Sequence, residues 1–322
     1  MRDKALVGSL FCAVAGAAWG AQFPIAGRVL TLIDPFHFTL LRYLAVSLIL
    51  GLLLILSEGI AALRFEGQTK RLWFYGTMAF TLYNFLVFLG QKAAGASGAA
   101  LASLMMALMP MASVLVMWVC EKTRPSTVTL GCIVAAFVGV LLVITKGDLS
   151  VLSSTSGSLI PTGLMLAGVF AWVIYTMGGS QFTWSPLRYT TLSCLLGTAS
   201  ALGMVGFATI AGYLRLPAAG TLWAIRWEMT YMIVVSGVLA LFSWNAGNRA
   251  LTPINGILFI NLVPVTTFVI STLSGYEIGE LEVVGATVTI TSLVLNNLYQ
   301  RAALRGDDRA STDMSAIGSG RK

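Results

Sequence analysis

Ten stretches of about twenty residues, each nearly free of charged side chains, make up most of this 322-residue chain. A helix of about 20 apolar residues is long enough to cross the hydrocarbon core of a bilayer. Charged residues are 10% of the chain, against about 25% in soluble domains, so they could not cover a water-facing surface. The sequence therefore predicts an all-α membrane protein with ten transmembrane helices. The predicted helices span roughly residues 5–25, 36–56, 72–90, 97–119, 127–146, 159–178, 188–211, 229–248, 254–273 and 281–299.

The few charged residues lie mainly between these stretches and near the C-terminus. The net charge is +7, but the basic residues form no continuous face that could bind nucleic acid. If the N-terminus is cytoplasmic, fourteen of the twenty Lys and Arg residues are cytoplasmic, five are external and Arg42 lies within the second stretch. Lys and Arg accumulate in cytoplasmic loops. We therefore predict a multi-pass protein with both termini in the cytoplasm, surrounded by lipid bilayer.

The residue types that carry catalysis or bind metals are scarce. The four cysteines have no C-x-x-C spacing, and His37 is the single histidine. A metal site or a disulfide framework is not indicated by this pattern. An intramembrane enzyme needs a nucleophile with a base, paired acids or a metal, and the phosphate-binding motif of ATP-driven proteins is absent from the sequence. We expect no metal, no cofactor and no enzymatic activity.

Proline and glycine recur at the same spacing in the two halves of the chain. Gly131 follows Pro110 by 21 positions, and Gly285 follows Pro264 by 21 positions. Each half holds five predicted helices, and because five is odd the second half must be inverted in the membrane. Inverted repeats are typical of secondary transporters. We divide the chain into a first five-helix repeat, a second five-helix repeat and a disordered, basic cytoplasmic tail, at residues 1–150, 151–300 and 301–322.

Several short motifs occur in the same order in both halves. The motifs are Trp19-Gly20-Ala21-Gln22-Phe23-Pro24, Asp34-Pro35, Arg42, Ala99-Ala100, Pro110, Glu121, Gly131 and Gly139, then Trp244-Asn245, Asn261-Leu262-Val263-Pro264-Val265, Glu277 and Gly285. In this pattern the chain resembles the EamA-type repeat of the drug/metabolite transporter superfamily. Cys120 stands where the family has a glycine before Glu121, and Tyr276 separates Gly275 from Glu277.

The resemblance implies a ten-helix transporter of bacterial inner membranes, built from two inverted repeats. Superfamily members move amino acids, other metabolites or toxic organic compounds, often outward. We therefore expect an exporter of a small organic metabolite, such as an amino acid or a related solute, that works by alternating access. A non-catalytic membrane scaffold or a lipid scramblase is the alternative. The sequence leaves open the substrate, the coupling and whether the protein is a homodimer.

Arg42 is the first candidate for a substrate-binding residue. It lies about seven residues into its helix, roughly 10 Å along the axis. A charge at that depth is costly and usually faces a cavity or a partner. It could bind an anionic group such as a substrate carboxylate. Alternatively, its long side chain could reach the headgroups or pair with carbonyls at a helix end.

Amide and aromatic side chains inside the predicted helices complete the candidate site. A buried amide needs a partner, which is either another helix or a wet cavity. A deep aromatic ring either packs against neighbouring helices or lines a cavity for an apolar solute. The amide candidates are Gln22, Asn84, Asn245 and Asn261, and the aromatic candidates are Trp19, Trp172, Tyr175 and Trp244.

Three prolines lie inside predicted helices, where they free backbone carbonyls. Pro24, Pro110 and Pro264 are therefore candidate hinges, although each could equally be a static kink. In contrast, no Asp or Glu lies in the middle of a predicted helix. We expect transport to be facilitative, or coupled by exchange or through groups other than carboxylates.

Overall fold

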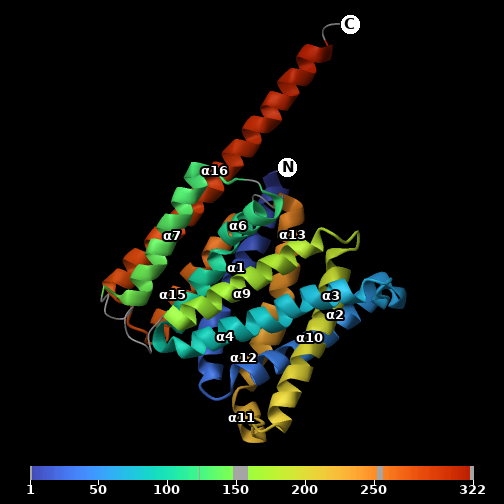
Figure 1. The fold of residues 1–322 in the computed structure, drawn as a ribbon, viewed down its shortest axis with the longest axis vertical. Coiled ribbons are helices and arrows are strands. Elements are labelled where there is room, and N and C mark those ends of the chain that lie inside the picture. Colours follow the sequence, from blue (N-terminus) through green and yellow to red (C-terminus); the bar gives the residue numbers. More distant parts are fainter. Residues whose placement is uncertain (1, 123, 148–158, 252–256, 320–322) are drawn as a thin grey trace.

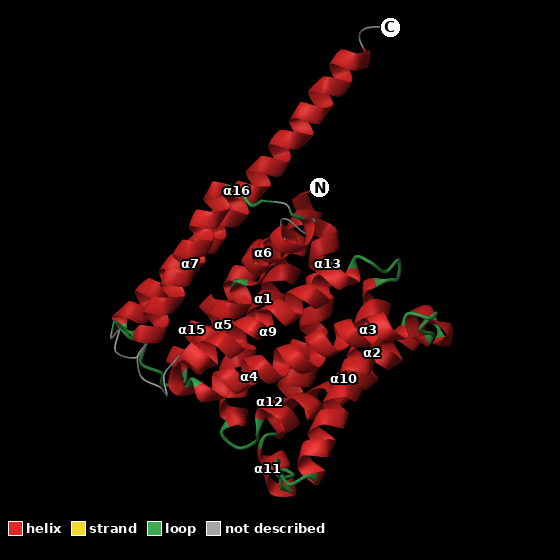
Figure 2. Ribbon diagram, viewed as in Figure 1, coloured by secondary structure: helices red, strands yellow, loops and turns green. Residues whose placement is uncertain are grey.

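The computed structural model describes residues 2–122, 124–147, 159–251 and 257–319, and within these ranges the chain is helical without strands (Figures 1 and 2). In the first half the helices are α1 (Arg2–Leu30), α2 (Pro35–Glu58), η1 (Ile60–Leu63), α3 (Thr69–Gly76), η2 (Thr77–Tyr83), α4 (Asn84–Ala93), η3 (Gly95–Ser97), α5 (Gly98–Ala107), α6 (Met109–Glu121) and α7 (Thr127–Thr145).

The second half repeats this order of helices. Two segments, η2 and η4, are π-helical, and they occupy corresponding positions in the two halves. The helices of the second half are α9 (Leu159–Gly179), α10 (Pro186–Ile210), α11 (Ala219–Ala224), α12 (Arg226–Thr230), η4 (Tyr231–Leu239), α13 (Ala240–Leu251), η5 (Ile257–Asn261), α15 (Leu262–Leu273) and α16 (Glu280–Ser319).

Helix starts follow from local side-chain chemistry. Asp34 caps α2: its Oδ1 accepts from the backbone N–H of Phe36 and of His37, at 3.0 and 2.9 Å. Ser185 caps α10 in the same way, accepting from the Arg188 N–H at 3.0 Å. A proline follows each cap, where its missing N–H costs no hydrogen bond. These Asp-Pro and Ser-Pro pairs therefore set where the two helices begin.

Eight of the described helices are long and apolar enough to cross a membrane, and the bent pair of α5 and α6 makes nine if it counts as one span. The two members of that pair meet at 49°, and Pro110 lies in the first turn of α6. Of the predicted helix 254–273, the structure describes the shorter apolar helix Phe259–Leu273. Residues 252–256 lie outside the described residues, so the prediction of ten helices stays unconfirmed.

The end of α16 differs from the sequence-based expectation. The sequence predicts a disordered tail from residue 301, whereas the described backbone continues as helix to Ser319. This segment contains Ala, Leu and Arg, which favour helix, and it contains no proline. Figure 1 shows this part of α16 extending beyond the rest of the molecule.

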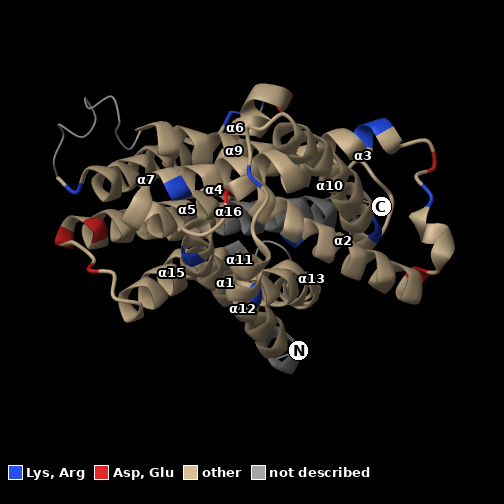
Figure 3. Ribbon diagram, turned by 90° about the horizontal axis from the view of Figure 1, so that it is seen from below, with Lys and Arg blue, Asp and Glu red and all other residues tan. Residues whose placement is uncertain are grey.

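Helix contacts repeat between the halves. Helix α1 of the first half packs against α13 and α15 of the second half. The corresponding helix of the second half, α9, packs against η2, α4 and α6 of the first half. The pairs α2 with α10 and α7 with α16 each join corresponding helices. Charged residues lie mainly at helix ends and in loops (Figure 3). This arrangement surrounds a central space with residues from both halves.

Glycines allow the closest helix contacts. A Cβ added at Gly139 of α7 would lie 2.5 Å from the Gly285 O of α16, too close for any side chain. Gly131, which stands at the position of the first half equivalent to Gly285, has no atom within 4 Å of such a Cβ. The shared Pro-to-Gly spacing therefore marks equivalent positions in the two halves and does not predict where α7 and α16 cross.

Candidate functional site

A cavity of about 560 Å³ lies between the two halves. Helices α1, α2, α4, α6, α9, α10 and α13, together with η2 and η4, contribute side chains to its wall. Nine of the twelve residues that the sequence singles out line this cavity. They are Trp19, Gln22, Arg42, Asn84, Pro110, Trp172, Tyr175, Trp244 and Asn245.

The other three candidates lie elsewhere. Pro24 and Pro264 do not line the cavity, and neither does Asn261, which is buried with 8% of its surface exposed. Sequence cannot separate these residues from the lining set, because a helix buried on several sides places polar residues toward neighbouring helices as well as toward a cavity.

Arg42 is held by residues from two other helices. Its side chain is buried, with 4% exposed. The guanidinium Nε donates to Met232 O at 3.1 Å, and Nη2 donates to Ser236 Oγ at 3.0 Å and Gln22 Oε1 at 3.3 Å. The Ser236 hydroxyl in turn donates to Gln22 Oε1 at 2.8 Å. This network holds the buried guanidinium against α1 and η4, and one of its three bonds is made to a backbone carbonyl.

The remaining two N–H groups of Arg42, on Nη1, have no protein partner among the described residues. Among the described residues, no Asp or Glu carboxylate lies within 4.0 Å of the Arg42 guanidinium. Burying a cation without a counter-ion is costly unless its hydrogen bonds are satisfied. The site therefore offers a carboxylate-sized anion two charged donors and a favourable field.

Aromatic rings form the wall beside Arg42. The Trp172 ring lies 5.0 Å from Tyr83 and 5.4 Å from Tyr175, between ring centroids. Tyr175 stacks on Tyr189 at 5.1 Å with an interplanar angle of 16°. Across the cavity, the Trp19 and Trp244 rings lie 5.5 Å apart. Such surfaces bury an apolar or planar group and also stabilise a cation over a ring face.

The amides play different parts. Asn84 has a partner within the protein on each of its amide atoms: its Nδ2 donates to Ala79 O at 2.8 Å, and its Oδ1 accepts from the Tyr43 hydroxyl at 3.3 Å. These bonds tie the π-helical segment η2 to α2. Asn248 also lines the cavity, and its buried Oδ1 has no hydrogen-bond partner in the described structure. This oxygen is a buried acceptor left unpaired in a residue of the cavity wall.

The cavity is closed at one end and accessible at the other. The lining residues around Arg42 are buried, whereas Gly179 and Trp184 are half-buried and Pro186 is exposed. Beyond Arg42 the closed end is filled by a hydrophobic cluster in which the Phe38 and Phe88 rings meet edge to face at 4.9 Å. A solute can therefore enter from the end where α9 ends and α10 begins.

Several lining residues were missed by the sequence analysis. Tyr43, Tyr189 and Ser236 all contribute to the wall. Ser236 bridges Arg42 and Gln22, yet a single serine in an apolar helix usually bonds to its own backbone and gives no distinctive pattern. Tyr43 and Tyr189 give no distinctive pattern either, because tyrosines are ordinary residues in the packed interior of a membrane protein.

A buried carboxylate, Glu282, was also missed. It lies in the first turn of α16 with its side chain 0% exposed and forms an ion pair with Lys146 at 3.3 Å. It also accepts from the Tyr276 hydroxyl at 2.6 Å. Burial and the bond to Glu282 raise the pKa of Tyr276. Because Glu282 does not line the cavity, we assign it to anchoring the start of α16 on the end of α7.

A polar cluster flanks the accessible end of the cavity. Arg188 donates to Ala62 O at 2.8 Å and to Glu66 Oε1 at 2.7 Å, and its guanidinium lies 4.2 Å from the centre of the Trp184 ring. The hydrogen bonds from Arg188 and Trp184 lower the pKa of Glu66. Because the pKa of Glu66 is lowered, its ion pair with Arg188 is fully formed at pH values above the ordinary pKa of glutamate. The ion pair is lost only as the pH falls through the lowered pKa.

Replacing Arg188 with alanine should loosen this end of the cavity. The loop of residues 59–66 would lose its carbonyl and carboxylate contacts, so its amide hydrogens should exchange about tenfold faster. Hydrogen exchange measured by mass spectrometry on the purified protein checks this, with Arg215→Ala, an exposed arginine, as the control. Equal protection of residues 59–66 in both variants would contradict the assigned role.

Together, the apolar helices and the central cavity define a polytopic α-helical membrane protein with a cavity between its two halves. The model of the EamA-like transporter family matches residues 6–145 and 160–298, so the chain belongs to this family and contains its repeat twice. Its members are transporters of the drug/metabolite transporter superfamily, as the sequence resemblance predicted.

Curated relatives agree with this assignment. The uncharacterized transporter YrdR of Bacillus subtilis (strain 168) is 43% identical over 301 residues, covering 93% of this chain and 94% of the relative. The uncharacterized transporter YyaM of the same organism is 28% identical over 280 residues, covering 85% and 88%. A solved crystal structure that is 17% identical superposes with a TM-score of 0.58 over 93% of this chain and 97% of its own, and so shares the fold.

Proposed function

We propose that the protein is a secondary transporter that exports a small carboxylate-bearing metabolite, such as an amino acid or a related solute, across the inner membrane. The observation that carries the proposal is Arg42, a buried guanidinium that faces a cavity with two N–H groups free of described protein partners. The twelve residues singled out from sequence remain proposals for roles in binding or bending.

Alternating access between two inverted repeats is supported by the repeated helix contacts. The division at residues 1–150 and 151–300 places five predicted helices in each half. Helices α1 and α9 make corresponding contacts in the two halves, and the cavity lies where the halves meet. Pro110, at the 49° bend between α5 and α6, is the best placed of the three proposed hinges because it also lines the cavity.

The predicted orientation supports an outward direction of transport. With the N-terminus cytoplasmic, the end of α9 and the start of α10 are cytoplasmic, and the cluster around Phe38 and Phe88 is external. The accessible end of the cavity then faces the cytoplasm, as expected for an exporter waiting to bind its substrate. Arg42 would lie at the far end of the entry path, where it stops the carboxylate beneath the closed external end.

The cavity lining also bears on coupling. The described residues that line it include no Asp or Glu, so a membrane-embedded carboxylate is not part of this proposed site. We propose that transport is facilitative, or coupled by exchange or through groups other than carboxylates.

Transport by purified protein in proteoliposomes tests the proposal. Vesicles preloaded with a panel of unlabelled amino acids and other carboxylates should take up the labelled form of at least one of them, with saturation. Saturable counterflow separates a transporter from a scaffold, which moves nothing, and from a scramblase, which moves fluorescent lipid between leaflets. Lipid scrambling without solute counterflow would overturn the proposal.

A further inference from the structure

Backbone carbonyls beside Pro24 of α1 accept hydrogen bonds from side chains of other helices. Thr267 of α15 donates its hydroxyl to Gly20 O at 2.7 Å. On the other side, Gln91 of α4 donates Nε2 to Phe23 O at 2.7 Å. Proline has no backbone N–H, so Gly20 O cannot receive the i+4 hydrogen bond of a regular helix. The Thr267 hydroxyl therefore supplies the donor that Pro24 lacks.

The bond from Thr267 lies where the backbones of α1 and α15 approach closely. Thr267 is buried, with 0% of its surface exposed. A Cβ added at Gly20 would lie 2.5 Å from Val263 O, so any side chain there would collide with α15. The hydroxyl also lies 2.9 Å from Val263 O in its own helix, but Gly20 O is the nearer acceptor and the one that has lost its helical N–H donor. A buried carbonyl without a donor is costly, so this hydroxyl holds the two helices in register.

The segment of α1 that is held in this way carries two side chains of the cavity wall. Gln22, two residues after Gly20, accepts from Arg42 Nη2 at 3.3 Å. Trp19, one residue before Gly20, donates Nε1 to Ser236 O at 3.2 Å. Moving this segment would take Gln22 Oε1 away from the guanidinium. Because the guanidinium is planar and rigid, the position of Nη2 sets the direction of Nη1.

The corresponding contact of the second half has no such bond among the described residues. A shift of 154 positions carries Ser113 of α6 to Thr267. Ser113 lines the cavity and donates to Pro110 O at 2.7 Å, within its own helix. In α9, five residues after its tryptophan as in α1, Met177 stands in place of Pro24 and keeps its N–H for the helix. The cross-helix hydroxyl bond therefore belongs to α1 alone of these two helices.

We propose that Thr267 is a positioning residue for anion binding: its hydroxyl holds the Gln22 segment of α1 against α15 and thereby keeps the Arg42 guanidinium directed into the cavity. Thr267 does not line the cavity, so it acts through α1. Pro24 is then a fixed kink, held by its neighbouring helices. The inference rests on the proposed function, in which Arg42 binds the carboxylate of the substrate.

A double-mutant cycle tests the hydroxyl bond without any substrate. Thr267→Val keeps the shape of the side chain and leaves Gly20 O without a donor. The midpoint of thermal unfolding in detergent should therefore fall by about 3–6 °C. Pro24→Ala gives Gly20 O the N–H of residue 24, so in that background Thr267→Val should lower the midpoint by less than about 2 °C. Equal falls in the two backgrounds would overturn the assigned bond.

Counterflow of an acid and of its carboxamide in proteoliposomes tests the positioning role. Thr267→Val should raise the KM of the acid about fivefold or more, keep its maximal rate within about twofold, and leave exchange of the carboxamide unchanged. Thr267→Ser keeps the hydroxyl, so the KM of the acid should return to within about twofold of the wild type. A purely structural residue would instead lower the exchange of both solutes in the same proportion.

The matched control is Thr272→Val in the same helix. Thr272 is exposed and donates to Phe268 O within α15, so its replacement should change neither the KM of the acid nor the unfolding midpoint by more than about 2 °C. Equal losses of acid and carboxamide exchange in Thr267→Val, or no rescue by Thr267→Ser, would overturn the positioning role. Absence of counterflow in the wild-type protein would instead overturn the proposed function, and the thermal cycle would still decide whether Thr267 supplies the missing donor.

Discussion

Replacing Arg42 with alanine should lower the uptake of a carboxylate-bearing substrate by about ten- to a hundredfold. The variant loses two free N–H donors and the positive charge in a buried cavity, and a hydrogen bond to a charged group contributes about 1.5–3 kcal/mol. Each 1.4 kcal/mol is about a tenfold change in affinity. Initial rates in proteoliposomes over a range of concentrations measure the loss, which should be mainly an increase in KM.

Lys92→Ala is the matched control for this substitution. Lys92 is also basic and donates to a backbone carbonyl, but it does not line the cavity. Its replacement should leave KM within about twofold of the wild type. Arg42→Lys should recover part of the rate, since an ammonium keeps the charge and loses the planar pair of donors. Unchanged kinetics in a folded Arg42→Ala protein would reduce Arg42 to a structural role.

Gly139→Val should destabilise the protein strongly, whereas Gly131→Val on the same helix should be tolerated. At Gly139 the added side chain meets the backbone of Gly285 and the side chain of Thr289, so α7 and α16 must separate. Forcing atoms into a packed interior costs about 1–3 kcal/mol or more. The midpoint of thermal unfolding in detergent should fall by about 5–10 °C.

The control is informative because both glycines belong to α7. Gly131 has open space at its Cβ position, so Gly131→Val should shift the unfolding midpoint by less than about 2 °C. Fluorescence-detected size exclusion after heating gives both midpoints from small samples. Equal midpoints for the two variants would show that α7 and α16 do not cross at Gly139.

Much of the fold follows from the sequence because membrane helices obey simple constraints. Length and low charge predict the helices, and the Asp34-Pro35 and Ser185-Pro186 pairs predict where two of them begin. The break between α5 and α6 could not be predicted as a 49° bend, because Pro110 alone does not specify how neighbouring helices pack. The crossing at Gly139 depends on the relative rotation of two helices, which the spacing of glycines does not determine.

The sequence indicates those residues of the candidate site whose types are rarest in apolar helices. Arg42, Gln22 and the deep tryptophans stand out because charges, amides and indoles are uncommon in an apolar helix, and the structure brings them to one cavity. Ser236 was not predictable, although it holds Arg42 in place, since serine is common in membrane helices. Asn261 is a rare amide in a predicted apolar helix that does not belong to the cavity lining.

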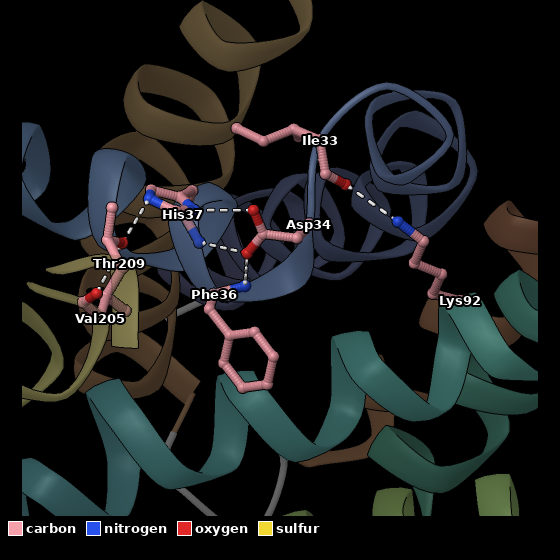
Figure 4. Close-up of polar contacts among 7 residues, drawn as sticks. All are labelled: Ile33, Asp34, Phe36, His37, Lys92, Val205 and Thr209. Carbon is pink, nitrogen blue, oxygen red and sulfur yellow. Dashed lines mark hydrogen bonds and ion pairs between the residues drawn. The ribbon is translucent and has the colours of Figure 1, made fainter. Parts of the chain in front are cut away.

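His37 illustrates a third kind of limit. As the single histidine it was judged only for metal binding and catalysis, and neither use was indicated. Its contact with Thr209 joins residues 172 positions apart. Such a contact becomes visible only when α2 and α10 are placed together, as Figure 4 shows for the closed end.

The most direct test of the central claim compares an acid with its carboxamide in counterflow, using wild-type protein and Arg42→Ala. The amide has nearly the same shape as the acid and lacks the anionic group that Arg42 is proposed to bind. Wild-type protein should exchange the acid at least tenfold faster than the amide, and the variant should exchange both at the same low rate. A preference for the acid that persists undiminished in Arg42→Ala would contradict the account.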